Sequence, residues 1–156
     1  AEYQEFPAEA FPVIETGNYR LKVLIGRFNE VVAPIQDDLT QVDYFDVTLQ
    51  PDRNFQYPLP KQHTNFIYVF EGNGQFNGQN VARHSLVAAD TEEDAFDFVA
   101  GKAGARFIVV SGKPVHEPIV QHGPFVMNTR EEIDQALLDY QTNQFVRDRA
   151  WVKRKQ

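Results

Sequence analysis

The side chains with the most potential for chemistry are the four histidines, His63, His84, His116 and His122. Imidazole can ligate a metal or carry a proton near neutral pH. No two of them stand two or four residues apart, the spacings that place ligands on one face of a strand or helix. His116, Glu117 and His122 form the tightest grouping, but adjacent residues of an extended chain point to opposite faces. The spacing therefore predicts solvent-facing or hydrogen-bonded histidines, not a metal site.

Other catalytic groupings are weaker. The chain contains no cysteine, which excludes disulfides, thiolate nucleophiles and zinc–thiolate sites. The acidic runs Asp37-Asp38 and Glu92-Glu93-Asp94 are interpreted as solvated turns. Ser85 and Ser111 lack the context of a nucleophile elbow. Gly72-Asn73-Gly74 is not followed by the lysine and hydroxyl residue of a phosphate loop.

Charge and hydropathy limit the partners. The formal net charge is -7, and an acidic domain repels a phosphate backbone, so direct binding to nucleic acid is not expected. Five acids lie between residues 90 and 97, and five basic residues lie between 147 and 155; both clusters are interpreted as solvated. No apolar run approaches the roughly 20 residues of a membrane span. Without a visible signal peptide, we expect a cytoplasmic protein with no membrane partner.

The elements that must position these residues are mainly strands. Thirteen Phe and six Tyr favour pleated surfaces. Short segments rich in β-formers, bounded by turn residues, predict strands at 19–28, 42–49, 65–71, 81–88, 95–100 and 105–111. Asn73-Gly74 predicts a hairpin turn, because this dipeptide suits type I′ turns, and Gly101 and Gly104 predict a turn between the last two strands. The pattern indicates an all-β sandwich or barrel.

One helix is expected near the end of the chain. Thr129 and Glu132 have the spacing of a capping box, and Ile133, Leu137 and Tyr140 follow at helical spacing. These signals predict a helix over about 130–142. We therefore expect residues 1–18 to form an N-terminal arm or interdomain linker, and residues 19–156 to form a single barrel with a C-terminal helix and a basic tail.

A family resemblance extends over nearly the whole chain. Asp43-Tyr44-Phe45-Asp46-Val47, Phe66-Ile67-Tyr68-Val69-Phe70-Glu71-Gly72 and, most specifically, Gly123-Pro124-Phe125-Val126-Met127-Asn128-Thr129 resemble the second domain of pirin-like proteins, a family of two-domain cupins. The resemblance implies a cupin, or jelly-roll, β-barrel. It also implies that the first domain is absent from this chain. That domain holds iron or another divalent metal on three histidines and one glutamate, and some members are quercetin 2,3-dioxygenases.

The resemblance places the metal-ligand positions of the first domain on this chain. The two expected histidines fall on Pro58 and Pro60, and the expected glutamate falls on Thr64. Proline offers no donor atom, and no histidine occurs between residues 95 and 111, where the last ligand belongs. We therefore expect no metal cofactor and no catalytic residue in this chain.

Three functions remain as expectations. The first is a metal-free C-terminal cupin domain with a structural or partner-binding role, in which the arm and the residues after about 121 pack on the family's N-terminal cupin domain or on a second copy in a homodimer. A regulatory protein partner is also implied. The second is the non-catalytic half of a quercetin 2,3-dioxygenase-like enzyme; whether the chain alone is an enzyme stays open. The third is a single cupin that binds a small apolar ligand, for which Phe45, His63 and Tyr68 are the candidate lining residues.

Overall fold

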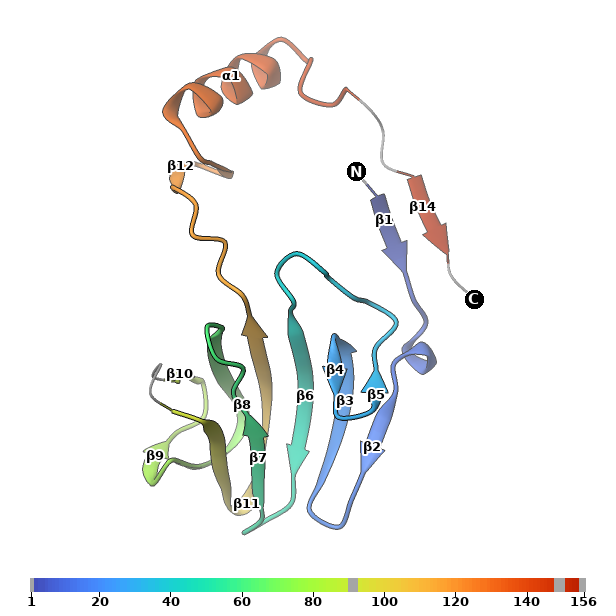
Figure 1. Ribbon diagram of the computed structural model, residues 1–156, viewed down its shortest axis with the longest axis vertical. Coiled ribbons are helices and arrows are strands. Elements are labelled where there is room, and N and C mark those ends of the chain that lie inside the picture. The colour runs from blue at the N-terminus through green and yellow to red at the C-terminus, as the bar shows by residue number, and fades with distance from the viewer. Residues whose placement is uncertain (1, 90–92, 148–150, 155–156) are drawn as a thin grey trace. The chain divides into compact units, whose positions relative to one another are not determined.

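The computed structural model describes residues 2–89, 93–147 and 151–154, drawn in Figure 1. The chain forms two compact units, Ala8–Pro114 and a smaller unit made of Ala1–Pro7 with Val115–Gln156. Parts of the two predicted charge clusters, at residues 90–92, 149 and 155, lie outside the described residues. Each unit is described by itself.

The larger unit is built around an eight-stranded sheet. Its elements are η1 (Ala8–Ala10), β2 (Val13–Glu15), β3 (Tyr19–Ile25), β4 (Arg27–Phe28), β5 (Val31–Val32), β6 (Asp43–Leu49), β7 (Asn54–Pro58), β8 (Thr64–Phe76), β9 (Gln79–Val81), β10 (Ser85–Ala88) and β11 (Ala95–Gly112). Neighbouring strands follow the order β10-β8-β11-β6-β3-β2, while β7 pairs with β11 and β9 with β8. Because Val13–Glu15 pair with β3, part of the expected N-terminal arm belongs to this sheet.

The core of the larger unit lies on one face of these strands. Alternation places Phe45, Val47 and Leu49 of β6 inward, beside Phe107 and Val109 of β11, and each is at most 2% exposed. Aromatic rings dominate the interior, with edge and stacked contacts among Phe28, Phe45, Phe55, Tyr57, Phe76, Phe96, Phe98 and Phe107. The predicted β-rich aromatic core is confirmed.

The predicted hairpin at Asn73-Gly74 is wrong, because β8 runs through it as one strand of 13 residues. Gly72 has a φ of 70°, and a Cβ there would stand 2.1 Å from the carbonyl oxygen of Gly104. These glycines allow two backbones to approach where the pairing with β11 shifts register. The chain does turn at Asn77-Gly78, a second Asn-Gly pair that also predicts a turn; it lies between β8 and β9, and both residues have positive φ.

The two late strands predicted at 95–100 and 105–111 are also one element, because β11 continues for 18 residues. Its first part pairs with β7 and its later part with β6, while β8 pairs along both parts. The expected turn at Gly101–Gly104 is a register irregularity between Ala100 and Ala105. Glycine at these positions therefore marks a bend in a long strand.

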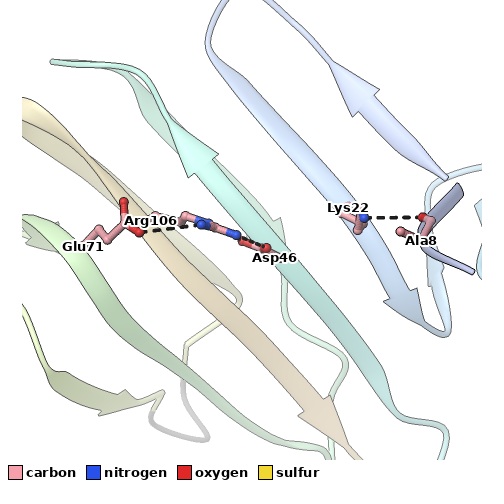
Figure 2. Close-up of polar contacts among 5 residues, drawn as sticks. All are labelled: Ala8, Lys22, Asp46, Glu71 and Arg106. Atoms are coloured by element: carbon pink, nitrogen blue, oxygen red, sulfur yellow. Dashed lines mark hydrogen bonds and ion pairs between the residues drawn. The ribbon is translucent and has the colours of Figure 1, made fainter. Parts of the chain in front are cut away.

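The outer face of the sheet carries a charged cluster, shown in Figure 2. Arg106 of β11 binds Asp46 of β6 through two hydrogen bonds, Nε–Oδ1 at 3.0 Å and Nη2–Oδ2 at 2.6 Å. Glu71 lies 3.6 Å away, and the guanidinium is 5.0 Å from the centre of the Phe70 ring. Asp46 first, and then Glu71, raise the pKa of Arg106. Nearer the sheet edge, the ammonium of Lys22 donates to a backbone carbonyl of η1.

The smaller unit contains the predicted helix. Its elements are β1 (Glu2–Glu5), β12 (Val120–His122), β13 (Phe125–Met127), α1 (Arg130–Gln141) and β14 (Trp151–Arg154); β12 and β13 form a hairpin and β1 pairs in parallel with β14. Thr129 caps α1, and the reciprocal bonds between Thr129 and Glu132 confirm the capping box. Ile133 and Ala136 are buried. Among the described residues, no helix is long and apolar enough to cross a membrane.

Candidate functional site

Four polar side chains meet at the end of the larger unit where β11 ends and β6 and β8 begin. Asp43 is the first residue of β6, Ser111 is next to last in β11, and Tyr57 lies in β7. His63 precedes β8. Sheet register brings them together, because Ser111 pairs with Asp43 on one side and with Asn65 on the other. These four residues are called the polar chain below.

The polar chain contains two side-chain hydrogen bonds. His63 Nδ1 lies 3.0 Å from Ser111 Oγ, and Tyr57 Oη donates to Asp43 Oδ2 at 2.8 Å. The other oxygen of Asp43 accepts from the backbone N–H of Arg27 at 2.8 Å. Ser111 is fully buried and Tyr57 is 5% exposed. Burial first, and then the hydrogen bond to Asp43, raise the pKa of Tyr57 well above its usual value.

Asn65 holds the backbone beside His63. Its Nδ2 donates to the carbonyl oxygen of His63 at 3.0 Å, and Asn65 is 7% exposed. Its Oδ1 has no hydrogen-bond partner within the described ranges. The neighbouring Gln62 has a φ of 71°, which a residue with a side chain seldom adopts. The turn before β8 therefore fixes where the imidazole lies.

A pocket of about 640 Å³ opens at this end of the unit, and Arg27, Gln36, Asp38, Asp43, Pro60 and His63 are among its lining residues. Asp37 also lines it and accepts hydrogen bonds from the Thr40 hydroxyl and from the backbone N–H groups of Leu39 and Thr40. These bonds, with the Thr40 hydroxyl first, lower the pKa of Asp37. Polar and acidic side chains therefore make up much of the pocket lining.

The three candidate lining residues of a barrel ligand are not brought together. His63 lines the pocket. Phe45 is fully buried, packed edge-on against Phe28 and Tyr57 at 5.4 and 5.3 Å between ring centres. Tyr68 points away from the core, because alternation along β8 buries its neighbour Ile67 on the inner face and leaves Tyr68 partly exposed on the outer one. A shared apolar ligand site for these three does not fit this geometry.

The other histidines lie elsewhere. His84 is exposed in the turn before β10 with a φ of 64°, and its backbone N–H donates to Val69. His116 and His122 belong to the smaller unit, and both are exposed. Across the described part of the chain, no three His, Asp or Glu side chains are grouped so that they could hold a metal ion.

The positions expected to align with metal ligands were tested against this geometry. Pro58 is exposed at the end of β7, Pro60 is partly buried beside the pocket, and Thr64 is exposed at the start of β8. The inward positions of β7 are instead Phe55 and Tyr57. This set offers no imidazole or carboxylate to a metal, so the residues do not fit an iron site.

Sequence patterns did not single out Asp43, Tyr57 or Ser111 as a group. The available signal was polarity at an inward position: Ser111 follows Phe107 and Val109 at alternate positions of one strand. A polar residue there needs a partner, because a buried hydroxyl without a hydrogen bond is costly. The identity of that partner depends on which distant segments of the chain pair with this strand. The residue pattern within a single strand does not carry that information.

The antiparallel sheet closed over an aromatic interior, with a polar opening at one end, defines a cupin domain. The family of Pirin C-terminal cupin domains matches residues 44–146. The chain belongs to this family, as its closing segment already indicated.

Relatives with curated descriptions agree with this assignment. The chain is 34% identical over 157 residues to human pirin and 35% identical over 159 residues to a pirin-like protein of Arabidopsis thaliana, in each case over 96% of this chain. It is 37% identical over 148 residues, or 90% of the chain, to a Pseudomonas aeruginosa protein with the provisional name quercetin 2,3-dioxygenase. The chain spans about half the length of these relatives, with 51% to 53% of each covered.

A solved structure shows the same fold. The crystal structure titled quercetin 2,3-dioxygenase from Acinetobacter baumannii superposes with a TM-score of 0.82 at 26% identity, over 89% of this chain and 49% of that one. The chain is thus a mostly β, cupin-type domain related to quercetin 2,3-dioxygenase-like proteins, and the expected fold class is confirmed.

Proposed function

We propose that this chain acts as a metal-free C-terminal cupin domain that supports and binds a partner domain. The observation that carries the proposal is the filled interior. Phe45, Phe55, Phe96, Phe98 and Phe107 are each at most 1% exposed and pack ring against ring where a metal-binding cupin needs room for ligands and substrate. The partner is the family's N-terminal cupin domain or a second copy of this chain.

Exposed apolar side chains of the smaller unit support a partner-binding role. Leu138 and Tyr140 of α1 are 53% and 66% exposed, and Val126 of β13 is 58% exposed. Phe125, Tyr140 and Phe145 pack against one another in edge-on and tilted contacts, with ring centres 5.3 to 6.4 Å apart. Grouped apolar side chains of this size favour association. This agrees with the expectation that residues after about 121 contact a partner.

Light scattering after size-exclusion chromatography tests this role. We expect the chain to self-associate as its concentration rises, and we expect Leu138→Ser with Tyr140→Ser to shift it to monomer. Leu39→Ser is the matched control, because Leu39 is 76% exposed but belongs to the larger unit. A chain that is monomeric at every concentration, or a control that dissociates it equally, would contradict a second copy of this chain as the partner and would leave the N-terminal cupin domain as the one proposed.

The second candidate function is the supporting half of a quercetin 2,3-dioxygenase-like enzyme whose metal lies in an N-terminal cupin domain. The observation in its favour is that the chain matches about half of proteins bearing that name. Oxygen uptake with quercetin and added iron tests it. We expect no uptake by this chain alone; turnover by this chain would place the active site here and would overturn both candidates.

A further inference from the structure

Two Asn-Gly pairs, Asn73-Gly74 and Asn77-Gly78, carry a reactivity that the proposed function leaves unused. Asparagine is a thermolabile residue, because the backbone nitrogen of the next residue can attack the carbonyl carbon of its side chain. Glycine favours this attack, since it has no Cβ to crowd the nitrogen and allows a wide range of backbone angles. Both pairs are followed by glutamine, so their local sequence does not distinguish them and the fold must.

The first pair is locked inside the sheet. Gly74 pairs with Val81 of β9 on one side and with Ala100 of β11 on the other. A Cβ at Gly101 would stand 2.0 Å from Asn73 Oδ1, so the Asn73 amide lies against the backbone of β11. Ring closure must turn the peptide group between Asn73 and Gly74, and that rotation would break the strand pairing. The fold therefore protects Asn73.

The second pair is exposed in the turn between β8 and β9. Asn77 and Gly78 have φ angles of 45° and 81°, and a type I′ turn requires positive φ at both central positions. Beyond the chain neighbours of Gly78, no described atom lies within 4 Å of where its Cβ would stand. Within the described ranges, the N–H of Gly78 makes no hydrogen bond. The nitrogen that must attack is therefore free.

The side chain of Asn77 makes two hydrogen bonds to the residues at the start of β11 and just before it. Its Oδ1 accepts from the backbone N–H of Asp97 at 3.3 Å, and its Nδ2 donates to Glu93 Oε1. A donor at Oδ1 stabilises the negative charge that forms on this oxygen when the carbonyl carbon is attacked. The bond to Glu93 ties the turn to the segment that precedes β11.

We propose that Asn77 is a modification site, at which the chain deamidates itself to aspartate or isoaspartate without an enzyme. Gly78 N loses its proton to hydroxide and bonds to Asn77 Cγ. The bond from Cγ to Nδ2 then breaks, and ammonia leaves with a proton from water, which restores the hydroxide. A second water opens the resulting cyclic imide: cleavage between Cγ and the nitrogen gives aspartate, and cleavage between the backbone carbonyl carbon and the nitrogen gives isoaspartate.

The product changes the contacts of the turn. A carboxylate cannot donate to Glu93, and two carboxylates at this distance repel each other. Isoaspartate also adds a methylene group to the main chain of the two-residue turn, which then no longer matches the pairing of Phe76 with Gln79. The reaction therefore loosens the link between this turn and the segment before β11, and it does so irreversibly because the ammonia is lost.

Peptide mapping by mass spectrometry tests the site. The folded chain is kept at mildly alkaline pH beside the same chain unfolded in guanidinium chloride, and both are sampled over time. Trypsin yields one peptide, residues 62–83, that contains both pairs, and its fragmentation assigns the exchange of NH₂ for OH to one asparagine. We expect Asn77 to convert roughly fivefold or more faster than Asn73 in the folded chain, and the two rates to agree within about twofold in denaturant, because only the fold protects Asn73. Equal rates in the folded chain, faster conversion of Asn73, or an unreactive Asn77 while the unfolded chain converts would overturn the proposal.

A charge-matched pair of variants tests the consequence. Asn77→Asp carries the carboxylate of the product, whereas Asn80→Asp places the same charge on β9, where its side chain still accepts from Gln75 Nε2. We expect a lower midpoint of urea unfolding in Asn77→Asp than in Asn80→Asp. Matching midpoints would overturn the loosening assigned to the reaction.

Discussion

Tyr57 donates a hydrogen bond of 2.8 Å to Asp43, which ties the end of β7 to the start of β6. The bond is shielded from water, since Tyr57 is only 5% exposed. The contact therefore contributes to the stability of the barrel at the end where the pocket opens.

Tyr57→Phe should destabilise the domain by about 1–3 kcal/mol, because the ring still fits but the partly buried carboxylate of Asp43 loses its donor. The measurement is urea unfolding at neutral pH, followed by fluorescence. Tyr44→Phe is the control, since Tyr44 lies partly exposed on the other face of β6, and it should change stability by less than about 0.5 kcal/mol. Equal effects of the two variants would contradict the role given to the Tyr57–Asp43 bond.

Stability should fall with alkaline pH in a way that depends on Tyr57. Its pKa is raised in the folded state, so its contribution is complete below the unfolded pKa near 10 and is lost as pH rises above that value. The unfolding free energy should drop by up to about 1.4 kcal/mol per pH unit from this group. Between pH 8 and 11, the unfolding free energy should decline less steeply in Tyr57→Phe than in the unchanged chain. Parallel declines would contradict a raised pKa of Tyr57 in the folded state.

The bidentate pair between Arg106 and Asp46 should show measurable coupling. In a double-mutant cycle with Arg106→Met and Asp46→Asn, we expect a coupling free energy of about 1 kcal/mol, because two charge-assisted hydrogen bonds join neighbouring strands. Arg20 and Glu15 form a more exposed single contact at 3.1 Å, and their cycle should give less than about 0.5 kcal/mol. Equal coupling free energies in the two cycles would show that the second hydrogen bond between Arg106 and Asp46 adds no stability.

Gly72→Ala should destabilise the domain more than Gly78→Ala. Both residues have positive φ, so each variant incurs roughly 1–2 kcal/mol of backbone strain. Only at Gly72 would the new methyl group meet a backbone oxygen, at 2.1 Å, whereas nothing lies within 4 Å at Gly78. Thermal unfolding of both variants measures the difference; matching midpoints would contradict the close approach of β8 and β11.

Local sequence signals predicted elements well where the cause is local. The capping box of Thr129 and Glu132 placed the start of α1 correctly, because both bonds form within one turn of chain. Alternation also identified the inward face of β6. The same signals failed at Gly72-Asn73-Gly74. Glycine is needed there because the backbone of a strand some 30 residues away in the sequence comes close.

The site was harder to predict for a related reason. His63 is a candidate lining residue in the sequence and lines the polar pocket, but its buried partner Ser111 is 48 residues away. Phe45 and Tyr68 were grouped with it from strand pattern alone, and they lie in the core and on the outer face. A polar chain that crosses four segments of the fold becomes visible only when the pairing of those segments is known.

Metal content measured by plasma mass spectrometry tests the central claim most directly. The untagged chain would be incubated without oxygen in excess iron(II), manganese(II) or nickel(II) and then desalted. A metal-free C-terminal cupin domain should retain well below one ion per chain, roughly a tenth or less. Retention of nearly one equivalent of a single metal would show that ligands converge in the barrel, and would contradict the account.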